Sequence, residues 1–238
     1  MTEMNMLKRK RKSYFVIEAI SIIEEEGINK LSARTVSQKA GFNTSSIYTY
    51  FTNMDHLESL ACIAFTKNYL LDLDKGFKDK SWIEKYIVMW ELFLKYSFRS
   101  PVEFSRVFYP SSREEWTYNL YKEYFEMFPD EIIFDESILQ YFIIGSTERG
   151  YHRDKYLLKN AVEEGSLDKN KIDYIAEVNI AYTYYIVCDI INGVLDPSDP
   201  KLYNKCMSYI ILTLKPYVAK EFADYINEKL AEYDLSFE

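Results

Sequence analysis

The chain has 238 residues, of which 48% are hydrophobic and 28% charged, and its formal net charge is −8. This length can bury a full core as one large or two small domains. The acidic balance argues against nucleic-acid binding over the whole surface, and only seven glycines and six prolines favour long helices over turn-rich β-structure.

Charge is distributed unevenly along the chain. Residues 1–51 contain eight Lys/Arg and five Asp/Glu, whereas the remainder contains 21 basic and 32 acidic residues. The densest basic run is Lys8-Arg9-Lys10-Arg11-Lys12. Such a run can be a solvated tail or a set of phosphate contacts. A basic end on an acidic remainder favours nucleic-acid binding by that end alone.

Residues 31–53 predict two short helices joined by a tight turn. Ser32 is a good N-cap for the first helix, Gly41 suits the left-handed position just past its end, and Asn43 can cap the second. The apolar positions that would share one small core are Leu31, Val36, Ala40, Ile47 and Phe51. This pattern predicts a helix-turn-helix, whose second helix enters the DNA major groove.

The second helix carries hydroxyl side chains where an ordinary surface helix would carry Glu, Lys and Ala. Hydroxyls form hydrogen bonds with phosphates and base edges, although a polar helix occurs in any small helical domain. Together with the basic run, the predicted DNA contacts are Arg34, Thr44, Ser45, Ser46, Tyr48, Thr49 and Tyr50.

Residues 14–60 resemble the N-terminal domain of the tetracycline-repressor (TetR) family of bacterial regulators. The matching motifs are Val16-Ile17-Glu18-Ala19-Ile20, Leu31-Ser32, Gln38-Lys39-Ala40-Gly41 and Ile47-Tyr48-x-Tyr50-Phe51-x-Asn53. A looser similarity covers Ala161-Val162-x-x-Gly165 and the helix that ends at Gly193. The resemblance implies an all-helical homodimer, a DNA operator and usually a small-molecule inducer.

Two positions depart from the family pattern. Met54 stands where the family commonly has a lysine, and Ala33 stands where a hydroxyl residue is frequent. Each change removes an expected phosphate contact, although the backbone N–H groups at a helix start can still bind a phosphate.

The rest of the chain predicts an all-α bundle. Residues 53–75 read as one long helix capped by Asn53, and Pro216 is expected to kink the last helix. The other expected helices cover 81–98, 101–109, 112–128, 135–150, 153–164, 169–195 and 199–232. We therefore expect a DNA-binding domain at 1–54 with a basic N-terminal arm, and a helical ligand-binding and dimerisation domain at 55–238.

Aromatic residues gather in the middle helices and are either core packing or the lining of a ligand cavity. The predicted pocket residues are Trp90, Phe93, Phe104, Trp116 and Tyr141. We expect an apolar molecule there. The acidic body slightly favours a cationic one, because aromatic faces and carboxylates both attract positive charge.

Residues 180–195 would form a helix that is apolar on nearly every face, so both sides of this helix must pack against other parts of the protein. With the helix at 202–218 it suits a four-helix dimer seam, and the competing interpretation is a central helix of a monomeric core. The predicted interface residues are Tyr182, Ile186, Ile190, Tyr209 and Ile210.

No cofactor or metal site is predicted. Cys62, Cys188 and Cys206 are too few and too scattered for a disulfide framework, and the two histidines do not make a zinc spacing. We expect a cytoplasmic protein, because neither a signal peptide nor a membrane span is visible. The sequence lacks a phosphate-binding loop and a nucleophile elbow.

The sequence thus predicts a homodimeric repressor of TetR type that binds operator DNA and responds to an unidentified small molecule. One alternative is a regulator of the same fold that is controlled by a protein partner. A less favoured alternative is an all-helical enzyme, with Glu148, Arg149 and His152 sharing a helix face.

Overall fold

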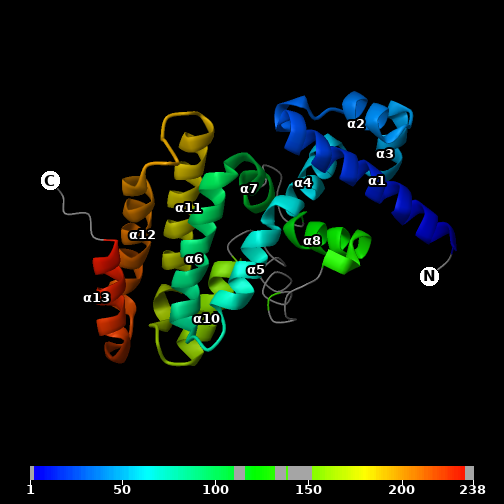
Figure 1. The fold of residues 1–238 in the computed structure, drawn as a ribbon. Coiled ribbons are helices and arrows are strands. Elements are labelled where there is room, and N and C mark those ends of the chain that lie inside the picture. The colour runs from blue at the N-terminus through cyan, green and yellow to red at the C-terminus, as the bar shows by residue number, and fades with distance from the viewer. Residues whose placement is uncertain (1–2, 110–115, 132–137, 139–151, 234–238) are drawn as a thin grey trace.

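The computed structural model describes residues 3–109, 116–131, 138 and 152–233. Within these residues the chain is helical, and its one β-type pairing is an isolated antiparallel bridge between Leu167 and Val218. Figure 1 shows a small head, residues 3–53, at one end of a larger helical body that begins at residue 54. The expected all-α class is confirmed.

The head consists of α1 (Glu3–Glu26), α2 (Ala33–Ala40) and α3 (Ile47–Tyr50), with 3₁₀ turns at Ile28–Lys30 and Thr44–Ser46. Its core is formed by side chains no more than 5% exposed: Phe15, Val16, Ala19, Ile22, Ile23, Val36, Ile47 and Phe51. The basic run lies inside α1, so the expected basic N-terminal arm is part of this helix.

Local capping fixes the turn between α2 and α3. Ser32 and Thr35 form a capping box, in which the Thr35 N–H donates to Ser32 Oγ at 3.1 Å. Gly41 has φ of 76°, a left-handed conformation that is cheap only for glycine. Asn43 precedes the 3₁₀ turn, but its side chain forms no cap hydrogen bond, contrary to expectation.

The predicted long helix at 53–75 is broken. Asn53 caps its start as expected, since Asn53 Oδ1 accepts from the His56 N–H at 2.9 Å. However, α4 (Met54–Ile63) and α5 (Lys67–Gly76) are separated by a 3₁₀ turn at Ala64–Thr66. The buried Thr66 hydroxyl donates to the Ile63 carbonyl at 2.8 Å, a bond to the preceding turn that often bends a helix.

The other helices of the body fall close to the predicted ranges, but the last expected helix is divided. It ends at a 3₁₀ turn, Lys215–Tyr217, that contains Pro216. The expected helix at 135–150 lies outside the described residues, apart from Ile138. The described helices are α6 (Trp82–Arg99), α7 (Pro101–Phe108), α8 (Trp116–Met127), α10 (His152–Glu163), α11 (Ile172–Ile191), α12 (Pro200–Leu214) and α13 (Ala223–Glu232). None of them is both long and apolar enough to cross a membrane.

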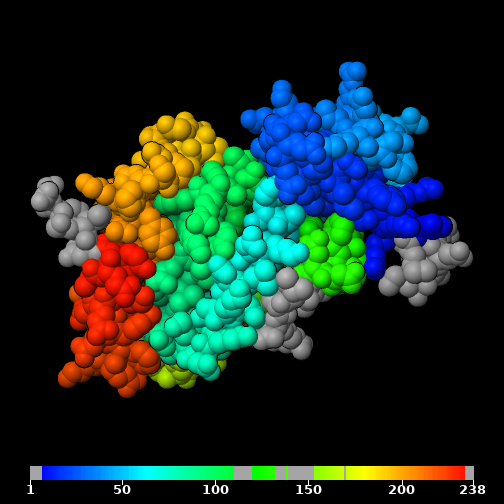
Figure 2. Space-filling view, viewed as in Figure 1, coloured from blue at the N-terminus to red at the C-terminus, as the bar shows by residue number. Residues whose placement is uncertain are grey.

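Helix α6 is central in the body, where it packs against α5, α7, α10 and α12. Its start is fixed by a capping box between Ser81 and Glu84. Helix α7 contacts α4 on one side and α11 on another, so it connects the interior of the body with the helix that leaves the head. The blue head projects from one end of the molecule, with α12 and α13 at the other (Figure 2).

Candidate functional site

The outer side of α3 and of the 3₁₀ turn before it presents hydroxyl groups to solvent. The exposed residues are Thr44, Ser45, Tyr48 and Thr49, with Tyr48 58% exposed. Arg34 on α2 is exposed as well. Ile47 and Phe51 point into the head and hold this short helix in place. The arrangement leaves a polar ridge free to enter a groove.

Two predicted contacts are less accessible than the others. Tyr50 is half-buried, and its ring centroid lies 5.7 Å from that of Phe15. Ser46 is half-buried too. Thr44 Oγ1 lies 3.1 Å from Ser37 Oγ, so its hydroxyl already has a partner within the head.

The basic run separates into two parts. Lys8, Lys10 and Arg11 are exposed, and Arg9 is partly exposed. Lys12 instead pairs with Glu123 on α8, and its ammonium group lies 4.9 Å from the centre of the Phe51 ring. In this conformation the charge of Lys12 is directed toward the body, so the predicted contact of Lys12 with DNA would require it to leave Glu123.

Glu123 also binds His56, so one carboxylate connects α1, α4 and α8. His56 Nε2 lies 2.8 Å from Glu123 Oε2. Burial by itself would raise the pKa of Glu123, but the hydrogen bonds from His56 and Lys12 hold it below its ordinary value. Nearby, Arg106 Nε on α7 lies 2.6 Å from Glu58 Oε1 on α4. A displacement of α7 or α8 would therefore be transmitted to α4 through these two contacts.

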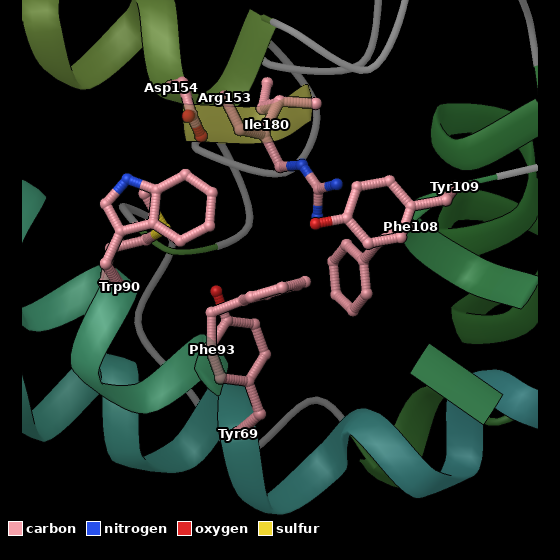
Figure 3. Close-up of a pocket in the computed structure, with 9 residues that line it drawn as sticks. Tyr69, Trp90, Phe93, Phe108, Tyr109, Arg153, Asp154 and Ile180 are labelled. Atoms are coloured by element: carbon pink, nitrogen blue, oxygen red, sulfur yellow. The ribbon is translucent and has the colours of Figure 1, made fainter. Parts of the chain in front are cut away.

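A pocket lies in the body between α5, α6, α7, α10 and α11 (Figure 3). The space between its side chains is about 330 Å³ when the open mouth is included, and its enclosed part is about the size of one water molecule. Its lining is Tyr69, Met89, Trp90, Phe93, Phe108, Tyr109, Arg153, Asp154 and Ile180.

Two of the predicted pocket residues, Trp90 and Phe93, line this space. Phe104 does not: it is fully buried behind the lining, with its ring 5.3 Å from that of Phe108, so that prediction is wrong. The Trp116 side chain and Tyr141 lie outside the described residues.

The sequence-based prediction missed the charged residues of the pocket. Arg153 and Asp154 are 7% and 5% exposed. Arg153 precedes Leu157 by four residues, and Asp154 precedes Leu158 by the same spacing. In a helix this spacing places each charged residue on the same inward-facing side as the leucine one turn later. That spacing was the signal available in the sequence: two charged residues at positions predicted to face the core.

Asp154 is held by a chain of hydrogen bonds from three helices. Tyr86 on α6 donates to its carboxyl group, Asn179 Nδ2 on α11 donates to the Tyr86 hydroxyl at 3.1 Å, and Thr213 Oγ1 on α12 donates to Asn179 Oδ1 at 3.0 Å. Burial raises the pKa of Asp154 to about 8, against the opposing effects of Arg153 and Tyr86.

Helix α11 leaves an apolar face uncovered. Tyr174, Val178, Ala181 and Tyr185 are exposed and follow one another at spacings of four, three and four residues, which places them on one stripe. The exposed large apolar residues of this end of the body are Tyr174, Val178, Tyr184, Tyr185, Ile191, Val194 and Leu212.

The predicted interface residues mostly face the other way. Ile186, Ile190 and Ile210 are at most 7% exposed and pack inside the chain, so they are not available to a partner and this part of the prediction is wrong. Tyr182 and Tyr209 are half-buried, with ring centroids 5.4 Å apart, and join α11 to α12.

Residues 18–58 match the family model for "Bacterial regulatory proteins, tetR family". The structure of RolR in complex with resorcinol is similar, with a TM-score of 0.60 and 10% identity over 95% of this chain and 96% of that one. A protein of unknown function from Rhodococcus sp. RHA1 gives a TM-score of 0.54 and 12% identity over 86% of this chain and 95% of that one. No curated protein sequence matches the chain. The match over the helix-turn-helix, on an all-helical fold of this arrangement, places the chain in the tetR family of DNA-binding transcription regulators.

Proposed function

We propose that the protein is a homodimeric transcriptional repressor that binds operator DNA through residues 1–54 and is released by a small molecule bound in residues 55–238. The exposed hydroxyl ridge around Tyr48 carries this proposal, because it is the surface that a helix-turn-helix presents to the major groove. The exposed cations at Lys8, Lys10 and Arg11 supply charge for phosphate contacts.

Dimerisation follows from the uncovered face of α11. An apolar stripe of this length on an otherwise polar protein marks an interaction surface, and a two-fold dimer pairs the same patch on both subunits. We assign Tyr174, Val178 and Tyr185 to the interface, in place of the inward-facing isoleucines. Two heads would then grip two half-sites of the operator.

The pocket is linked to the head through α7 and α4. Phe108 lines the pocket at the end of α7, and Arg106 on the same helix pairs with Glu58 on α4. A ligand that pushes on Phe108 would move α4 and change the separation of the two heads. It can do so only if it binds the released and DNA-bound states with different affinity. RolR, solved with the ligand resorcinol, supports a small-molecule effector on this fold.

The size of the pocket favours a second candidate function. Because the enclosed part holds about one water molecule, a ligand must enlarge it. In the alternative, a protein partner controls the same fold by binding the body, and no small molecule enters. If a small molecule controls the protein, some compound should raise the melting temperature and change the affinity for DNA. If a protein partner controls it, no compound should change either quantity.

Sequencing the DNA retained by the protein from a pool of random duplexes tests the proposal. We expect a two-fold symmetric site whose affinity falls when Tyr48→Ala is introduced, by about 1–3 kcal/mol for a lost base or phosphate contact. Lys159→Ala, which removes an exposed charge on α10, is the control and should leave binding unchanged. Absence of any retained duplex at low salt would overturn the proposal.

A further inference from the structure

The pocket contains two buried polar atoms that have no hydrogen-bond partner among the described residues. They are Nε1 of Trp90 and Oδ2 of Asp154, on side chains that are 2% and 5% exposed. A buried group without a partner costs free energy, so such groups are rare in folded proteins and point to something that binds them. Figure 3 shows both residues on the same side of the pocket.

We infer that the effector is a small, uncharged ring compound whose hydroxyl group binds Trp90 Nε1 and Asp154 Oδ2. The inference rests on the proposed effector function of the body and specifies the chemistry of that same site. The hydroxyl would fill the water-sized enclosed part of the pocket, and the ring would enlarge the open part between the aromatic side chains.

A hydroxyl is the group that satisfies both atoms at once. Its oxygen accepts from the Trp90 N–H, and its proton can be donated to Asp154 Oδ2. If the carboxyl is protonated, Oδ2 becomes the donor and the hydroxyl oxygen accepts instead. The same ligand group therefore fits either ionisation state of Asp154, whereas a ketone or an ether fits only one.

The charges around the site disfavour ionic ligands. The Arg153 guanidinium lies 4.2 Å from the centre of the Phe108 ring and lines the pocket, so it repels a cation, as does the Trp90 N–H dipole. An anion would meet the Asp154 carboxylate where that group is ionised, and at lower pH it would still lose its hydration on entering this buried site. The expectation of a cationic effector, which rested on the acidic composition of the body, is thereby replaced by an uncharged one.

The lining favours a flat ring. Trp90 and Phe93 meet edge to face, with centroids 5.5 Å apart and planes at 82°, and Phe93 meets Phe108 in the same way at 5.3 Å. Aromatic walls of this kind accept another ring in offset or edge-to-face contact. In Figure 3 Arg153 points toward Tyr109, on the side of the pocket opposite Trp90.

The test compares four probes that share one ring: phenol, benzoate, benzylamine and toluene. Binding to the full chain is measured by calorimetry and by the rise in melting temperature, which follows from mass action. We expect phenol to bind at least tenfold more tightly than each of the other three. Equal affinity for phenol and toluene, or tighter binding of benzoate or benzylamine, would overturn the inference.

Two variants locate the hydroxyl. Trp90→Phe keeps a ring but removes the N–H, and Asp154→Leu removes Oδ2 with little change in side-chain volume. Each should weaken phenol binding about tenfold or more and leave toluene binding little changed. Trp82→Phe, on the same helix but outside the pocket lining, is the control and should bind phenol like the wild type.

The stability of the unliganded variants gives a second readout. If the Trp90 N–H has no partner, Trp90→Phe should melt at the same temperature as the wild type or higher. A lower melting temperature together with no binding of any probe would mean that the space holds only an ordered water, which overturns the inference.

Operator binding is measured on the same samples, so that failure of the proposed repressor function can be distinguished from failure of the inferred ligand. Operator binding without any probe binding refutes the inferred ligand alone. Phenol binding that leaves operator affinity unchanged refutes the effector function but leaves the binding site in place.

Discussion

His56 on α4 and Glu123 on α8 lie 2.8 Å apart, with Lys12 of α1 bound to the same carboxylate. This contact connects the helix that leaves the head with a helix of the body, at a point where Glu123 is only 28% exposed. Because partly buried charges are screened less than surface ones, the contact should contribute to both stability and the coupling of head and body.

We expect Glu123→Gln to lower the free energy of unfolding by about 1 kcal/mol at neutral pH, since two charge-assisted hydrogen bonds weaken. The folded-state pKa of Glu123 lies below its ordinary value. Its contribution is therefore present above the ordinary glutamate pKa and is lost as the pH falls through the folded value. Urea unfolding between pH 3 and 7 measures this difference, with Glu126→Gln, an exposed residue on α8, as the control.

Asp154 should produce the opposite dependence on pH. Its pKa is raised by burial to about 8 in the folded protein, above its ordinary value near 3.9. The folded state therefore binds an additional proton between these values, and stability falls as the pH rises from about 4 to 8, by at most about 1.4 kcal/mol per unit. Asp154→Asn should flatten this part of the profile, while Asp224→Asn, at an exposed position on α13, should leave it intact.

The side of α11 that forms the dimer interface can be identified by introducing a charged residue on each side of this helix in turn. Val178→Glu should give a folded monomer with weakened operator binding, because Val178 is 37% exposed on the uncovered stripe. Ile186→Glu should instead unfold the chain, because Ile186 is 5% exposed and an unpaired buried charge is strongly destabilising. Light scattering and circular dichroism separate the two results. Lys159→Glu, a charge change on α10, should alter neither property.

A Val178→Glu protein that remains a dimer would place the interface elsewhere. A wild-type protein that is monomeric at micromolar concentration would contradict the dimer altogether.

Lys10 and Lys12 should affect DNA binding differently. Lys10 is exposed, and each neutralised phosphate adds about 0.9 to the slope of the logarithm of affinity against the logarithm of salt concentration. Lys10→Ala should reduce the magnitude of that slope by about this amount. Lys12→Ala should leave the slope unchanged, because Lys12 binds Glu123 in the body. The measurement is operator affinity over a series of salt concentrations, and equal effects from both variants would show that Lys12 turns to the DNA in the complex.

The helix-turn-helix could be predicted from the sequence because its determinants are local. Ser32 caps α2 and Gly41 adopts the left-handed conformation at its end, and both depend on residues within one turn. The spacing of Ile47 and Phe51 was enough to tell the inner side of α3 from the outer side that carries Tyr48. Such a motif can be predicted from local backbone geometry and apolar periodicity, without knowledge of contacts between distant residues.

The break in the helix after Ile63 could not be predicted in this way. Thr66 has no helix-breaking signal of its own, and its bond to the Ile63 carbonyl is accompanied by a contact of 3.0 Å with the Tyr121 hydroxyl, 55 residues away. The partner of Lys12 is likewise 111 residues distant in sequence. Long-range contacts of this kind have no periodicity that a single sequence displays.

The helical class, the helix-turn-helix and the exposed position of Tyr48 can be predicted from the amino-acid sequence, because these follow from local capping and periodicity. The side of α11 that is exposed could be identified only from the packing of the whole fold, since a helix that is apolar on nearly every face has the same sequence pattern in either orientation. The same packing places Trp90 and Asp154, 64 residues apart, in the lining of one pocket. Packing of distant helices selects such faces and partners, because burial depends on the whole set of neighbours and not on the segment alone.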